Sequence, residues 1–134
     1  MKTLKIDHVG VAVRSAEESA KLFSNVLGLE IETELLDKEK LKIIMAKVGE
    51  SNIELLEDLD TQGTIAKFIE KHGEGLHHIA FEVDDVNEAV KTMKENGYRV
   101  LSEPHPGAGG TVVAFVHPKD THGILLELVE RNRH

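Results

Sequence analysis

The 134-residue sequence contains no cysteine, no tryptophan, one tyrosine and only four phenylalanines. Without cysteine, the chain forms no disulfide, no thiolate metal site and no thiol nucleophile. This composition fits a cytoplasmic protein, since disulfides belong to oxidising compartments. The shortage of aromatic residues means that aliphatic side chains must build the core.

Long apolar runs are also missing, and none approaches the roughly 20 residues of a membrane-spanning helix. The formal net charge is −8. Such a surface repels nucleic acids and anionic lipids, and no Lys/Arg run with interleaved aromatics offsets it. We therefore expect neither a membrane nor a nucleic-acid partner. A chain of this length suits one domain, residues 1–134.

Two segments of the chain, residues 6–13 and 76–83, share one pattern. Both alternate apolar residues with small or polar ones, which predicts strands with one apolar face. His8 and His78 occupy equivalent positions on the other face. A strand that only packed a core would not need a histidine there.

The resemblance between the two halves continues beyond these strands. Ser15 and Asp85 are predicted N-caps of the helices that follow, each with a glutamate three residues on. Each half ends on an aliphatic strand that carries a carboxylate, Glu54 in the first and Glu127 in the second. The chain is therefore an internal duplication, and each copy supplies one histidine and one glutamate.

The fold class that this pattern predicts is α+β. Each repeat reads β-α-β-β-β, over residues of about 4–57 and about 75–130, with a short linking helix at about 64–71. Residues 99–103 are a predicted strand of the second repeat. Two tandem modules of this kind form an open, curled mixed sheet, a partial barrel with helices outside. Its inner face would collect both histidines and both glutamates.

The residues His8, Glu54, His78 and Glu127 are candidate metal ligands. Two neutral imidazoles and two carboxylates suit a divalent ion such as Co, Mn, Ni or Zn, and their charges sum to zero with it. A single strand histidine is more often a packed or surface residue than a ligand. The duplication favours a metal site, although the spacing alone leaves both interpretations open.

Four stretches carry a resemblance to a known family: residues 7–13, 64–69, 75–80 and 117–128. Through them the chain resembles the vicinal-oxygen-chelate (glyoxalase/bleomycin-resistance) superfamily, and within it the methylmalonyl-CoA epimerases. The resemblance implies an isomerase that interconverts (R)- and (S)-methylmalonyl-CoA. It also implies an acyl-CoA substrate, a homodimer, and a divalent metal ion bound by His8, His78 and Glu127, with Glu54 as the fourth ligand.

In such an enzyme, the C2 proton is removed and a metal-stabilised enediolate forms. Inversion needs a base on each side of C2. The resemblance makes Glu127 one candidate and gives Lys42 at the position where some relatives have a second glutamate. A water molecule or Glu54 could serve instead of Lys42. It also suggests that Ala108, Gly109 and Gly110 border the acyl-CoA site, although a plain hairpin loop explains them as well.

Two other functions fit the same residues. A lactoylglutathione lyase (glyoxalase I) shares the superfamily, and its bacterial forms share the ligand set. A non-catalytic ligand-binding protein of the same superfamily is the second alternative, but such proteins typically lack the full metal set.

Overall fold

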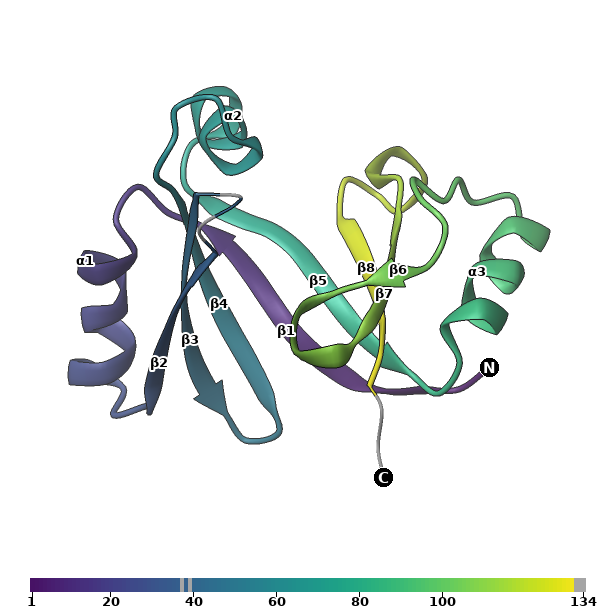
Figure 1. Ribbon diagram of the computed structural model, residues 1–134, viewed down its shortest axis with the longest axis horizontal. Helices are drawn as coiled ribbons and strands as arrows, with labels where there is room; N and C mark the ends of the chain where they lie inside the picture. The colour runs from purple at the N-terminus through teal and green to yellow at the C-terminus, as the bar shows by residue number, and fades with distance from the viewer. Residues whose placement is uncertain (37, 39, 132–134) are drawn as a thin grey trace. The chain divides into compact units, whose positions relative to one another are not determined.

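The computed structural model describes residues 1–36, 38 and 40–131 as a mixed sheet of eight strands with three α-helices (Figure 1). The hydrogen-bonded order is β2-β3-β4-β1-β5-β8-β7-β6. Because the order ends at β2 and β6, the described sheet is open, which confirms the predicted α+β class. The strands are β1 (Thr3–Ala12), β2 (Ile31–Leu36), β3 (Leu41–Val48), β4 (Ser51–Asp58), β5 (Gly75–Val83), β6 (His105–Pro106), β7 (Val112–Val116) and β8 (Leu125–Glu130).

The chain divides into two compact units. One comprises residues 8–77 and the other combines residues 1–7 with the chain from His78 onward. Both β1 and β5 contribute to both units. Parallel pairs join β1 to β4 and β5 to β8, whereas β2, β3 and β4 on one side and β6, β7 and β8 on the other are antiparallel.

In the unit of residues 8–77, the two faces of the sheet are covered differently. Helix α1 (Ala16–Lys21) packs on one face, where Ala20 lies against Ile44 and Leu55. Helix α2 (Thr64–His72) brings Ile65 against Ile43 on the other face. Residues of β3 therefore alternate between the α1 side and the opposite side, as the period of a strand requires.

The other unit has an equivalent arrangement. Helix α3 (Val86–Glu95) packs its buried valines and Ala89 on β7 and β8, and these residues form one aliphatic cluster. A bidentate ion pair links Arg131 to Asp7 at 2.7 and 2.9 Å, and Asp7 is only 2% exposed. This pairing compensates the burial of the aspartate charge.

Both predicted helix starts are confirmed. The Ser15 hydroxyl accepts from the Glu18 amide, and the Asp85 carboxylate accepts from the amides of Asn87 and Glu88. The first predicted helix continues past α1 as the π-helix η1 (Leu22–Val26). None of the described helices is long and apolar enough to cross a membrane.

The predicted strand over residues 99–103 was wrong. That segment contributes only the isolated bridge between Val100 and Val116. The backbone and guanidinium of Arg99 bind the Asp120 carboxylate instead, at 2.9 to 3.1 Å. The short strand β6 follows this segment and pairs with β7.

We expect Asp85→Ala to destabilise the protein by about 1 kcal/mol, because two amides of the first turn of α3 lose their acceptor. Urea unfolding followed by circular dichroism measures this loss. Asp85→Asn is the matched control, because the asparagine side chain still accepts. Equal losses in the two variants would contradict the capping role.

Candidate metal centre

The parallel pairing of β1 with β4 brings Glu54 close to His8. Glu54 pairs with Gly10, and His8 lies two residues before Gly10 on the same face of β1. A glycine opposite the glutamate leaves room for the carboxylate to lean toward the imidazole. The distance from His8 Nδ1 to Glu54 Oε2 is 3.6 Å.

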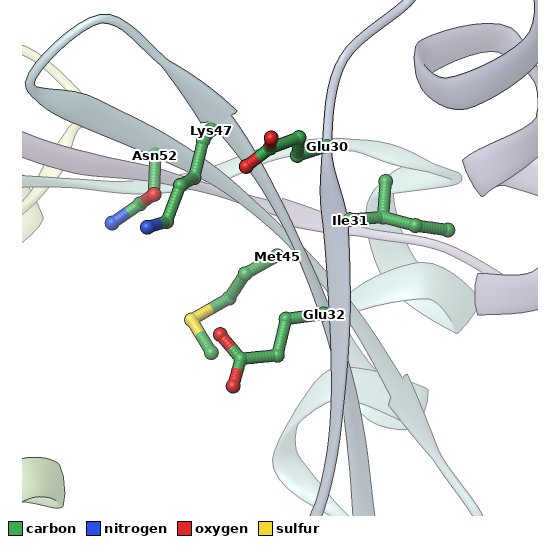
Figure 2. Close-up of a pocket in the computed structure, with 6 residues that line it drawn as sticks. All are labelled: Glu30, Ile31, Glu32, Met45, Lys47 and Asn52. Carbon is green, nitrogen blue, oxygen red and sulfur yellow. The ribbon is translucent and has the colours of Figure 1, made fainter.

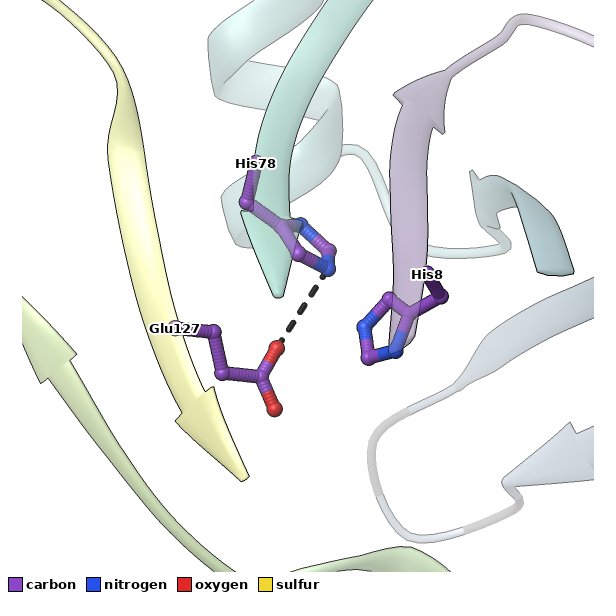
Figure 3. A group of neighbouring side chains, drawn as sticks. All are labelled: His8, His78 and Glu127. Carbon is purple, nitrogen blue, oxygen red and sulfur yellow. Dashed lines mark ion pairs between the residues drawn. The ribbon is translucent and has the colours of Figure 1, made fainter. Parts of the chain in front are cut away.

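The pairing of β5 with β8 repeats this arrangement in the other unit. Glu127 pairs with Ala80, and His78 lies two residues before Ala80. Here the small residue is a fully buried alanine. The distance from His78 Nε2 to Glu127 Oε1 is 3.5 Å, and the dashed line in Figure 3 marks this ion pair.

Both His–Glu distances suit two ligands of one ion better than a hydrogen bond. Hydrogen-bonded nitrogen and oxygen atoms lie about 2.7–3.2 Å apart. Two ligand atoms that each lie about 2.1 Å from a tetrahedral ion are about 3.4 Å apart. His8, His78 and Glu127 are also buried, at 7, 7 and 8% exposure.

His8, His78 and Glu127 form a group that can hold a metal ion. Each offers one ligand atom, and these atoms lie within 4.8 Å of one another (Figure 3). The donor set of two imidazoles and one carboxylate is typical of divalent first-row metals. Three of the four predicted ligands are thus brought together, and the fourth, Glu54, lies beside His8.

The other histidine of β5, His77, has a different environment. Its ring meets the Phe68 ring edge-on, with centroids 5.0 Å apart. His77 therefore packs against Phe68 of α2.

Lys42 lies on the α1 side of β3, the side opposite to Met45 and Glu54. Met45 pairs with Glu54, so the two side chains share one face of the sheet. Lys42, which pairs with Glu57, lies three residues before Met45 on the same strand. Because side chains alternate along a strand, an odd separation puts Lys42 on the opposite face. The Lys42 ammonium donates to Glu17 of α1 at 2.5 Å and lowers the pKa of that carboxyl group. Because Lys42 lies on the face opposite to Glu54 and binds Glu17, we do not propose it for proton transfer.

The predicted substrate loop forms the 3-10 turn η2 (Ala108–Gly110). Gly109 and Gly110 have φ angles of 67° and 75°, a left-handed conformation that glycine adopts without strain. The side chain of Ala108 lies outside the described part of the chain. The amide of Gly107 donates to the Thr111 carbonyl at 2.9 Å, which closes the loop.

The turn at residues 117–123, which carries part of the family resemblance, has a structural role. Its Asp120 binds Arg99, and these hydrogen bonds lower the pKa of Asp120 to about 2. The amide of His117 also donates to the Arg99 carbonyl at 2.9 Å. The turn therefore anchors the segment that precedes β6.

A pocket of about 250 Å³, which the sequence did not reveal, lies over β2, β3 and β4 (Figure 2). Glu32, Met45 and Asn52 belong to the same sheet face as Glu54, by the strand register. Only the pairing of three strands brings these residues together. The lining residues are Glu30, Ile31, Glu32, Met45, Lys47 and Asn52.

Comparison with known proteins agrees with this fold. Residues 7–115 match the glyoxalase/bleomycin resistance protein/dioxygenase superfamily. The chain therefore belongs to that superfamily.

Individual relatives of the chain indicate which family within the superfamily it belongs to. The ethylmalonyl-CoA/methylmalonyl-CoA epimerase of Cereibacter sphaeroides is 39% identical over 92% of this chain and 96% of its own. The mitochondrial methylmalonyl-CoA epimerase of Bos taurus is 39% identical over 92% of this chain and 73% of its own. A Streptomyces coelicolor methylmalonyl-CoA epimerase variant, solved with 2-nitronate-propionyl-CoA, has a TM-score of 0.89 at 34% identity, over 98% of this chain and 100% of that chain. Within the superfamily, the chain belongs to the methylmalonyl-CoA epimerase family of isomerases.

We expect His8→Ala to weaken binding of Co²⁺ by at least about 100-fold, because the variant loses a direct nitrogen ligand. Isothermal titration calorimetry measures the affinity. His77→Ala, which removes a histidine that packs on Phe68, should bind Co²⁺ like the unmodified protein. Unchanged affinity in His8→Ala would contradict the site.

Proposed function

We propose that this protein interconverts (R)- and (S)-methylmalonyl-CoA and uses a divalent metal ion held by His8, His78, Glu127 and Glu54. The observation that carries the proposal is the group of His8, His78 and Glu127, whose ligand atoms lie within 4.8 Å of one another. Its presence in a chain similar to methylmalonyl-CoA epimerases supports both the substrate and the use of a metal.

The residues fit a divalent ion by chemistry and by charge. Neutral imidazoles and ionised carboxylates suit Co²⁺, Mn²⁺, Ni²⁺ and Zn²⁺, and two carboxylates balance the charge of such an ion. When bound, the ion would act as a Lewis acid toward the carbonyl oxygens of the substrate and would make the C2 proton more acidic.

Glu127 is our candidate for the proton transfer on one side of C2. A carboxylate has two oxygens, so one can bind the ion while the other accepts the proton. Burial of Glu127 supports this role, because water is largely excluded from its side chain.

We further propose that the loop of Ala108, Gly109 and Gly110 borders the acyl-CoA substrate. Successive backbone amides in such turns bind anionic groups, and a CoA thioester carries several phosphates. The left-handed glycines Gly109 and Gly110 support a turn of this kind.

The direct test is a stereospecific assay with pure (S)-methylmalonyl-CoA, in which formation of the (R) form is followed after chelation and after restoring Co²⁺. We expect activity only with the metal. Absence of turnover in both states, with turnover of the glutathione–methylglyoxal hemithioacetal, would instead establish a lactoylglutathione lyase. Inactivity toward both substrates would favour a ligand-binding protein.

We expect Glu127→Gln to reduce kcat of epimerisation by at least about 100-fold, because the amide cannot accept the proton. Glu95→Gln, at the exposed end of α3, is the matched control and should retain full activity. Activity of Glu127→Gln at the level of the control would rule out Glu127 as a base.

A further inference from the structure

Inversion at C2 through a planar intermediate requires a second proton carrier on the side opposite to the first. Lys42 does not fit, because it faces α1 and binds Glu17. We propose that Glu32, on the edge strand β2, is this second catalytic residue. Its role rests on the proposed function.

Three glutamates of the chain, Glu30, Glu32 and Glu34, follow one another at alternate positions. Glu32 and Glu34 therefore share one face of β2, and Glu30, which directly precedes the strand, lies on the same side. The strand register continues this face across β3 and β4, which carry the metal ligand Glu54. Each glutamate begins a different row of paired side chains across the sheet. The residues in each row indicate which glutamate is the best candidate.

The row of Glu32 leads to the candidate metal ligand Glu54 through a single residue. Glu32 pairs with Met45, and Met45 pairs with Glu54. Two strand spacings separate the outer residues, about 10 Å between backbones. Figure 2 shows the Glu32 carboxylate beside the Met45 thioether, in the pocket of about 250 Å³. A substrate carbon near Glu54 would therefore have Glu32 on the same sheet face, with an apolar side chain between them.

The two other rows end differently. Glu34 pairs with Ile43 and then Leu56, which belong to a buried aliphatic cluster. The Glu30 carbonyl accepts from the Lys47 amide, and this row continues through Asn52 to His8, so a charged lysine lies between Glu30 and the candidate ligand. Glu32 alone of these three joins a candidate metal ligand through an uncharged neighbour.

In one direction of the reaction, Glu32 takes a proton from C2 and Glu127 returns one. The Glu32 carboxylate removes the C2 proton, and the electron pair of that C–H bond passes into the carbonyl groups of the substrate. The protonated Glu127 then donates its proton to the other side of C2, and the electron pair returns to form the new C–H bond. Glu32 ends protonated and Glu127 ionised, which is the state required for the reverse reaction. Exchange with water restores the first state.

The test follows each pure epimer in D₂O with the metal-loaded protein and measures C2 deuteration by NMR and inversion by a stereospecific assay. In Glu32→Gln, we expect inversion to fall by about 100-fold or more. One epimer, whose proton faces Glu127, should still exchange its proton with retention of configuration. Metal content should be unchanged, because Glu32 is not a ligand.

Glu34→Gln is the matched control, because it alters the neighbouring glutamate on the same strand face. It should invert both epimers at the unmodified rate. Normal inversion by Glu32→Gln, or equal loss of exchange from both epimers, would overturn the assignment to Glu32. An unmodified protein that neither exchanges nor inverts the substrate would instead overturn the proposed function itself.

Discussion

The candidate site depends on two parallel strand pairs, β1 with β4 and β5 with β8. In each pair a glutamate lies opposite a residue too small to occupy the space beside it, Gly10 or Ala80. The histidine two positions earlier then lies about as far from the carboxylate as two ligands of one ion.

The two faces of the sheet divide structure from chemistry. On the α1 side of β3, Ile44 packs on the helix and Lys42 binds Glu17. On the other face, Met45 continues the row from Glu54 to Glu32. In the unit of residues 8–77, the proposed proton carrier Glu32 and the candidate ligands His8 and Glu54 thus come from the face that α1 does not cover. The face that packs α1 stabilises the fold, whereas the opposite face packs α2 through Ile43 and also carries the candidate site residues.

The strand–helix order and the four candidate ligands could be predicted from the sequence, because the internal duplication shows each sequence pattern twice. Both helix caps and both His–Glu pairs recur, and a repeated pattern is less ambiguous than a single one. The face of Lys42 could not be predicted, because β3 has apolar residues on both sides, Ile43 and Ile44 among them. The segment after α3 was predicted as a strand, but its backbone hydrogen bonds with Phe115 and His117 amount only to an isolated bridge. Glu32 carried no local signal, since its neighbours across the sheet come from two other strands.

The central claim is that one metal ion is held jointly by a histidine of the first repeat and by a histidine and a glutamate of the second. A crystal structure of the Mn²⁺-loaded protein, with the ion located by its anomalous scattering, tests this most directly. We expect one ion per chain, coordinated by His8, His78 and Glu127, with Glu54 as a fourth ligand. Two ions per chain, or one ion bound by a single His–Glu pair, would contradict the account.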